Sequence, residues 1–214
     1  MLYSDIQTNV QNILNRRDVT PSQLGTFVGM AIQRIQRILR VPAMETKASF
    51  TCDGTDGIVP VPGDLLELIA ITFNDQVNRR KLTKVDFQSG LRLSAVPGNP
   101  TSFYRDGGNF LVGPFPAAGS VCYISYYQDA SGLSAPTDHN WITDATPDCL
   151  IYGALSYAAD FFIDDRKQAF EQRFLGIVDE LTNMAKDDEL LNASISPAYS
   201  DDNGPFRQYS RWGY

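Results

Sequence analysis

The residues that could carry catalysis in this chain are few and widely spaced. His139 is the only histidine, and it lies in a loop two residues before Trp141. A catalytic histidine activates a nearby nucleophile, and the sequence places no serine or cysteine beside this loop. We therefore interpret His139 as a solvent-exposed loop residue.

The three cysteines, Cys52, Cys122 and Cys149, are odd in number and far apart in the sequence. This pattern argues against a disulfide framework and against a metal site, which usually shows closely spaced ligand pairs. Because free cysteine is among the most commonly buried residue types, we expect all three to be small core side chains.

Paired aspartates occur at positions 164–165, 187–188 and 201–202. Two carboxylates can share a metal ion or divide acid and base roles, but adjacent residues on a helix do not face each other. The pairs fit helix ends and solvated turns better. Neither G-x-x-x-x-G-K-[ST] nor G-x-G-x-x-G occurs, so no phosphate-binding loop is predicted. The sequence thus indicates no catalytic residues, no metal and no cofactor, and we expect a protein that is not an enzyme.

The composition is that of a globular protein. A chain of 214 residues with 43% hydrophobic and 20% charged residues can bury a sizeable core. No run approaches the roughly 20 apolar residues that span a bilayer, and the N-terminal residues MLYSDIQTNV lack the parts of a signal peptide. We therefore expect a soluble protein that is synthesised in the cytoplasm and contacts no membrane.

The net charge of −7 is unevenly distributed. Residues 1–48 hold six Lys/Arg and three Asp/Glu, a balance of +3, whereas residues 146–192 hold four and ten, a balance of −6. The two ends of the chain are therefore electrostatically complementary. Tight binding of nucleic acid is not expected of so acidic a chain, although DNA could slide past an acidic wall.

Two helices are predicted near the N-terminus. Ser4 and Gln7 have the spacing of a capping box, and apolar residues at helical intervals follow to about position 16. Thr20 and Gln23 repeat this start signal, and Pro42 ends the second helix. The result is a helical hairpin.

Between positions 47 and 140 the pattern changes to short apolar runs separated by turn sequences such as DGTDG and DGGN. The strand candidates are residues 50–52, 58–61, 69–73, 77–82, 103–105, 110–112 and 121–127. Strands of this length indicate a small antiparallel sandwich or barrel. Residues 83–101 fit this strand pattern least well. Residues 85–91 could form one helical turn there, and the whole stretch could be a protruding element.

The stretch from residue 141 to residue 165 is predicted to hold the central helix. Thr146 suits the N-cap, Pro147 the first helical position and Asp148 the first turn. A helix that is apolar nearly all round belongs at the centre of a fold. Its core face is predicted to consist of Leu150, Ile151, Ala154, Leu155, Ala158, Phe161 and Phe162.

A fourth amphipathic helix is predicted from residue 167 to about residue 187. The order of elements predicts an α+β fold, in which the two N-terminal and two C-terminal helices form one four-helix bundle from residues 1–46 and 141–192. A small antiparallel β-sandwich or barrel, residues 47–140, is inserted into this discontinuous bundle. Residues 193–214 follow as an extended C-terminal arm.

The arm combines glycines and prolines, which prevent a long helix, with many aromatic residues. The aromatic residues are Tyr199, Phe206, Tyr209, Trp212 and Tyr214. One interpretation is a loosely attached tail, because chain termini are commonly disordered. The other, slightly favoured, is an arm that docks its aromatic side chains on another subunit or protein, since disordered tails are usually poor in aromatics.

A run of scaffold residues covers most of the second half of the chain. It comprises Tyr104, Gly107, Gly108, Phe110, Leu111, Val112, Gly113, Pro114, Pro116, Gly119, Val121, Tyr126, Tyr127, Leu133, Trp141, Pro147, Asp148, Tyr152, Gly153, Ala154, Leu155, Ala158, Asp164, Asp165 and Arg166. In the first half, LRVP at 39–42 closes the helical hairpin and PGDLL occupies 62–66. This order of features resembles the head-to-tail adaptor, or connector, proteins of short-tailed bacteriophages.

The resemblance implies a structural protein of the virion. Adaptors of this kind form a ring, typically of twelve copies, beneath the portal protein, where the ring extends the DNA channel and presents a platform for the tail nozzle and tail fibres. DNA then passes through the lumen without sequence-specific binding. A C-terminal arm reaches along the portal in similar proteins, so the five aromatic residues of the arm become candidate portal contacts. The chain differs from smaller, mostly helical adaptors in its β insert.

Two sets of residues are candidate contacts between subunits of such a ring. Tyr152, Ala159 and Ile163 form a flank of the central helix that is more apolar than one core requires. The other set lies on the polar back of the helical hairpin and consists of Arg34, Arg37 and Arg40. These arginines either pair with the acidic helices of a neighbour and set the register of the ring, or form a solvated helix face.

Two other functional classes stay open. The tyrosine-rich β insert could be a receptor- or glycan-binding tail module, and the arginine-bearing helices could belong to a DNA-binding packaging accessory. The acidic balance of the chain argues against DNA binding, and no ligand-binding constellation supports a glycan site.

Overall fold

The computed structural model describes residues 1–74, 79–130 and 132–192. The helices are α1 (Tyr3–Leu14), α2 (Pro21–Ile38), the 3-10 helix η1 (Pro42–Met44), α3 (Phe87–Ser94), α4 (Trp141–Ala145), α5 (Pro147–Phe161) and α6 (Lys167–Asn192). The strands are β1 (Glu45–Thr51), β2 (Ile58–Pro60), β3 (Leu65–Asn74), β4 (Arg79–Lys81), β5 (Thr83–Lys84), β6 (Ser102–Asp106), β7 (Asn109–Gly113) and β8 (Val121–Gln128). The fold is mixed α+β.

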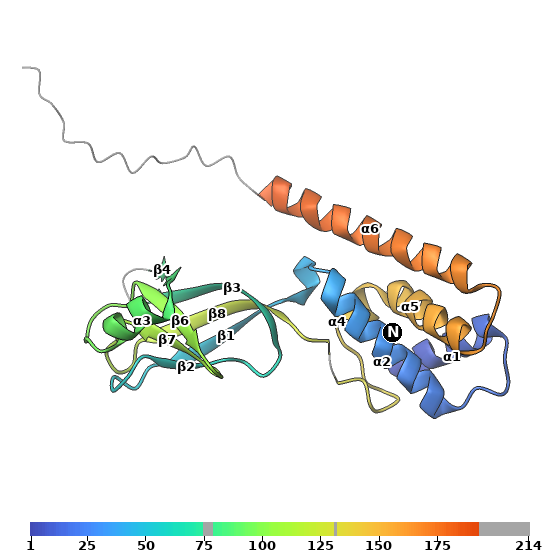
Figure 1. Ribbon diagram of the computed structural model, residues 1–214, viewed down its shortest axis with the longest axis horizontal. Coiled ribbons are helices and arrows are strands. Elements are labelled where there is room, and N and C mark those ends of the chain that lie inside the picture. Colours follow the sequence, from blue (N-terminus) through green and yellow to red (C-terminus); the bar gives the residue numbers. More distant parts are fainter. Residues whose placement is uncertain (75–78, 131, 193–214) are drawn as a thin grey trace, which may run out of the picture.

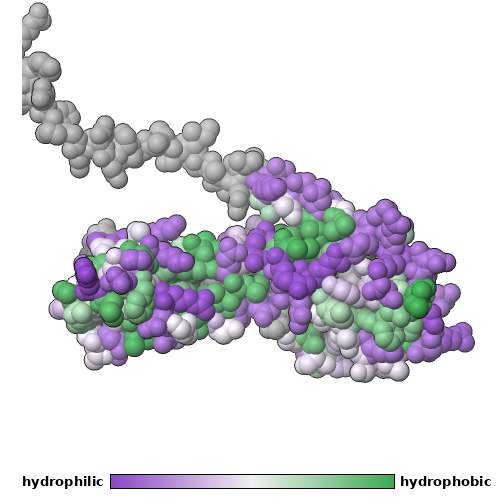
Figure 2. Space-filling model, in the orientation of Figure 1, coloured by the Kyte–Doolittle hydropathy of each residue, from purple (hydrophilic) through white to green (hydrophobic). Residues whose placement is uncertain are grey.

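Figure 1 shows two adjacent parts. The helical part contains α1, α2, α4, α5 and α6, and the β part contains all the strands together with α3. The chain enters the β part after α2 and η1, and it returns to the helical part after β8. Hydrophobic and hydrophilic surface alternate over both parts in the face drawn in Figure 2.

The helical hairpin at the N-terminus forms as predicted, with one difference at its start. The capping box of α2 is present, because Gln23 N donates to Thr20 Oγ1 at 3.3 Å and Thr20 N donates to Gln23 Oε1 at 2.9 Å. In α1, Ser4 is not the N-cap, since the helix already begins at Tyr3. There the backbone carbonyls of a distant loop accept hydrogen bonds from the first N–H groups, Tyr3 N to Asp138 O at 2.9 Å and Ser4 N to Pro136 O at 3.0 Å.

Helix α5 is the central helix of the helical part, which confirms its predicted position. Helices α1, α2, α4 and α6 all pack against it, and nine of its residues are buried. Thr146 occupies the N-cap position, but its hydroxyl donates to Ile142 O at 3.5 Å instead of capping α5. Ile142 belongs to the short helix α4, which was not predicted from the sequence. The prediction was wrong for Phe161, which is 59% exposed.

Helix α6 packs on α5 and continues to Asn192, beyond its predicted end. Gly153 permits this close approach, because an added Cβ would lie 3.1 Å from Ala31 Cβ and 3.2 Å from Phe174 Cε2. Phe174 is fully buried as a result. Two turns of α6, around Phe170 and Phe174, thus contribute to the core that α1, α2 and α5 share.

The β part contains two four-stranded sheets with the orders β1-β8-β3-β4 and β2-β7-β6-β5. All strand pairs are antiparallel except β5 with β6. Every predicted strand overlaps an observed one within the described ranges, and the DGGN turn forms the β6–β7 hairpin, with Gly107 at φ 55°. The predicted helical turn is the two-turn helix α3, which packs on β6 and β7.

Each part has a hydrophobic core of its own. The core of the β part includes Val59, Ile71, Phe73 and Ile124, and these side chains are separate from the cluster centred on α5. Apolar burial therefore stabilises both parts, each through contacts largely confined to itself.

Candidate assembly surfaces

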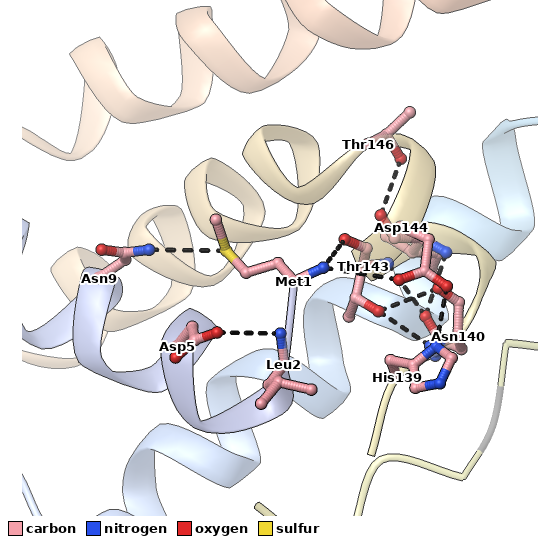
Figure 3. Close-up of polar contacts among 10 residues, drawn as sticks. Met1, Leu2, Asp5, Asn9, His139, Asn140, Thr143, Asp144 and Thr146 are labelled. Atoms are coloured by element: carbon pink, nitrogen blue, oxygen red, sulfur yellow. Dashed lines mark hydrogen bonds and ion pairs between the residues drawn. The ribbon is translucent and has the colours of Figure 1, made fainter. Parts of the chain in front are cut away.

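His139 lies beside Asp144 near the start of α4 (Figure 3). Its Nδ1 is 2.9 Å from Asp144 Oδ2, and its side chain is 61% exposed, as the sequence predicted. The amine of Met1 donates to the Thr143 carbonyl oxygen at 3.0 Å and lies 3.5 Å from Asp144 Oδ1. Hydrogen bonding with His139 lowers the pKa of Asp144. These contacts fasten the first residues of the chain to α4.

All three cysteines are buried, which confirms the sequence interpretation. The Sγ atoms of Cys52 and Cys122, which are 70 positions apart in the sequence, lie 3.7 Å apart inside the β part. The sequence did not predict this contact. Contact with the Cys52 thiol and burial raise the pKa of Cys122. Burial raises the pKa of Cys149, in the helical core, to about 12. Cys122 and Cys149 are therefore poor nucleophiles near neutral pH.

Within the described ranges, no group of three or more His, Cys, Asp or Glu residues is placed to hold a metal ion. In the same part of the chain, no helix is both long enough and apolar enough to cross a membrane. The remaining candidates are the surfaces that the sequence predicts to meet other subunits.

Arg34 is engaged inside the subunit. Its guanidinium forms a two-point ion pair with Glu171 of α6, in which Arg34 Nη1 lies 2.9 Å from Glu171 Oε2. The carboxylate also accepts a hydrogen bond of 2.6 Å from Ser156 Oγ, and the guanidinium lies 4.4 Å from the centre of the Phe174 ring. Hydrogen bonding from Arg34 lowers the pKa of Glu171 to about 2. The main role of Arg34 in the monomer is thus to join α2 to α6.

Arg37 lies one turn further along α2, and Arg40 lies just past the end of this helix, in different surroundings. Arg40 Nε is 2.7 Å from Glu67 Oε2 on β3, so this arginine links the helical part to the β part. Arg37 is exposed and forms no ion pair with any described residue. Of the three predicted contact arginines, Arg37 is the one whose charge is available to a partner.

The predicted apolar flank of α5 is not one continuous surface. Ala159 is fully buried in the subunit's own core, and Tyr152 is half-buried with its hydroxyl 2.9 Å from Arg173 Nη1. Ile163, by contrast, is 92% exposed. Its φ is 54°, a left-handed conformation that glycine favours and a β-branched residue rarely adopts. Asp164 N donates to Ala159 O at 2.8 Å and thereby closes the helix end around Ile163.

A groove of about 390 Å³ lies between α2 and α5. Phe27, Met30, Tyr157 and Phe161 form its apolar lining. Met30 and Phe161 are both exposed. The sequence did not predict this groove, because Phe161 was assigned to the core face of the central helix.

The five predicted arm residues, Tyr199, Phe206, Tyr209, Trp212 and Tyr214, lie outside the residues that the structure describes. The predicted arm therefore remains a prediction from the sequence.

Comparison with known proteins identifies the class to which this chain belongs, the head-tail adaptor proteins of bacteriophages. The model of the SU10 adaptor protein family matches residues 1–199, so the chain belongs to that family. A search of curated proteins found no match. The family consists of structural adaptors rather than enzymes, and it indicates a virion component that interacts with other virion proteins.

Proposed function

We propose that this protein forms the adaptor ring between the portal and the tail of a short-tailed bacteriophage. The observation that carries the proposal is the match to the adaptor family over residues 1–199, which spans both the helical part and the β part. In this proposal about twelve copies form a closed ring through one repeated head-to-tail contact. The ring extends the DNA channel and anchors the tail nozzle and fibres.

The helical part is proposed as the scaffold of the ring. Residues 1–46 and 141–192 act as a discontinuous four-helix bundle, and residues 47–140 act as an inserted β-sandwich that faces the tail proteins. Ile163 and Arg37 are the exposed members of the predicted contact residues that the structure describes, and the half-buried Tyr152 adds to this contact. An exposed isoleucine in a left-handed conformation costs free energy in the monomer. Such a cost is typical of residues at functional sites, which supports a role for Ile163 in the contact between subunits.

The portal is proposed to hold the arm formed by residues 193–214. Rigid aromatic side chains such as those of Tyr209 and Trp212 gain a large contact area at low entropic cost. The acidic chain, with a net charge of −7, lines or flanks the channel without retaining DNA.

The decisive experiment is electron microscopy of the full chain mixed with the portal of the same phage. We expect a ring of the protein stacked coaxially on the portal. Isolated copies bound at the periphery of the portal would contradict the proposal.

The arm is tested separately by deleting residues 199–214. We expect weaker binding to the portal in a pull-down, with an unchanged circular dichroism spectrum. Binding of undiminished strength would overturn the role of the arm while leaving the ring proposal intact.

A further inference from the structure

The two open edges of the β part carry opposite charges. β1 and β4 are the outer strands of one sheet, and β2 and β5 are those of the other. β4 and β5 lie at the same edge, because a single residue separates them and both contribute to one groove. Figure 1 shows β4 along the upper margin of the β part and β2 along the lower margin. The two edges therefore face away from each other, which is the geometry that a repeating head-to-tail contact requires.

The basic edge is formed by Lys81 of β4 and Lys84 of β5. Both side chains are exposed, and neither forms an ion pair with another residue in the described ranges. Arg105 of β6 lies at the same edge, where its Nε donates to Gly107 O at 3.2 Å. Two acids near this edge are engaged, since Glu67 pairs with Arg40 and Asp86 accepts from Ser89 N at 3.2 Å.

A groove of about 470 Å³ opens along this basic edge between β3 and β6. Leu82, Phe103 and Phe110 contribute buried apolar surface to it, and Lys81, Lys84 and Arg105 also line it. Strand β4 pairs only with Thr72–Asn74 of β3, so residues 65–70 have a described strand partner only on the β8 side. The groove thus combines apolar surface, positive charge and an open strand edge, which together suit an apolar, acidic segment of protein.

The acidic edge supplies such a segment. Asp53 and Asp56 are exposed in the loop between β1 and β2, and backbone N–H groups hold their carboxylates in place, Thr55 N at 2.9 Å and Ile58 N at 2.9 Å. Ile58 of β2 is 40% exposed, and β2 pairs only with β7. On β1 the exposed Lys47 is offset by the exposed Glu45, so the balance of this edge is negative.

We propose that the basic edge of one subunit receives the acidic edge of a second copy of this chain, with Ile58 entering the groove beside Lys81 and Lys84. A two-fold dimer through either edge would bring like charges together, so the charges favour a head-to-tail contact. This inference rests on the proposed ring function and adds a second, β-part contact to it. DNA is a poorer occupant, because the groove has apolar surface and the acidic edge would repel phosphates.

The test uses charge reversal in the full chain, imaged on the portal of the same phage. We expect Lys81→Glu with Lys84→Glu to reduce the fraction of portals that carry a ring by about tenfold or more. Asp53→Lys with Asp56→Lys, made separately, should reduce it similarly. The combination of all four substitutions should restore rings. Arg17→Glu with Lys186→Glu, two exposed positions of the helical part, is the charge-matched control for the basic edge and should assemble normally.

A second measurement does not depend on the reversed variants folding. Asp56→Cys combined with Lys84→Cys should give a ladder of disulfide-linked multimers on non-reducing gels of assembled rings, whereas either single substitution should not. The three native cysteines are buried and provide little background.

The outcomes separate this inference from the ring proposal. Rings that form normally with either reversed edge and without the disulfide ladder overturn the edge contact but leave the ring intact. If the wild-type chain forms no ring, both proposals are wrong. Binding of a labelled DNA duplex that disappears with Lys81→Glu and Lys84→Glu, while rings persist, would reassign the basic edge to DNA.

Discussion

Several charged residues of the helical part pair with one another inside the subunit, whereas exposed charged residues of the β part gather at its two open edges. In the helical part, Arg34 pairs with Glu171 and Lys167 with Asp160. In the β part, Lys81 and Lys84 form no ion pair within the described ranges. Ion pairs in the helical part therefore hold its helices against one another, while the β edges leave charge available for a partner. Five predictions, ordered by expected effect, test this contrast.

The largest effect is expected from Leu155→Asp in α5. Leu155 is fully buried at the centre of the helical core, and an unpaired buried charge costs about 3–5 kcal/mol. The free chain should unfold or aggregate, as followed by thermal denaturation. Leu175→Asp, at a position that is 48% exposed on α6, is the control and should fold normally. A folded Leu155→Asp protein would show that α5 is not the centre of the helical part.

Ile71→Ala in β3 should destabilise the β part selectively. Ile71 is fully buried in the core of the β part, and truncating such a side chain costs about 2–5 kcal/mol. Hydrogen exchange read by mass spectrometry should accelerate in β3 and β8 while α2 and α5 stay protected. Equal acceleration in both parts would mean that they unfold as one cooperative unit.

Glu171→Gln tests the internal pairing of charge. The folded pKa of Glu171 is about 2, below its usual value of 4.5, so its contribution to stability is present above pH 4.5 and is lost as the pH falls towards 2. We expect a loss of about 1–2 kcal/mol at neutral pH, reduced by partial solvent exposure.

The difference between wild type and Glu171→Gln should shrink in acid, as measured by urea denaturation at several pH values. Glu180→Gln, exposed on the same helix, is the control. A difference that does not depend on pH would contradict the role of the Arg34 ion pair.

Ile163→Gly should move stability and assembly in opposite directions. Glycine relieves the left-handed strain at φ 54° and should stabilise the free chain by about 1 kcal/mol, while the loss of an exposed apolar side chain should weaken ring formation. Ile163→Ala keeps the strained backbone and should weaken the ring without the gain in melting temperature. Unimpaired rings with both variants would remove Ile163 from the contact.

Arg37→Glu should have the smallest effect on folding. Because Arg37 is exposed and forms no ion pair in the described part of the chain, the free energy of unfolding measured by urea denaturation should change by less than about 0.5 kcal/mol. Assembly on the portal should weaken if the charge meets an acidic helix of a neighbour. Arg17→Glu, another exposed arginine, is the matched control, and equal assembly of both variants would leave Arg37 as a solvated residue.

Local signals in the sequence predicted local structure well. The Thr20 capping box, the DGGN turn and the apolarity of α5 each act over a few residues, so each could be recognised without knowledge of the rest of the chain. The start of α1 could not, because its N–H groups are capped by carbonyls of residues 136 and 138. The helix α4 was missed because it has only five residues and is followed by α5 after the single residue Thr146.

The sequence by itself determined the two helical pairs, the intervening strands, the burial of the cysteines and the likeness to phage adaptors, because these depend on periodicity, composition and short motifs. Only the tertiary structure decided which charges are already paired, that Ala159 is buried while Ile163 is exposed, and that Cys52 lies 3.7 Å from Cys122. It also placed like charges on the same edge of the β part. Such relations join residues far apart in the chain, and no local pattern encodes the distance between them.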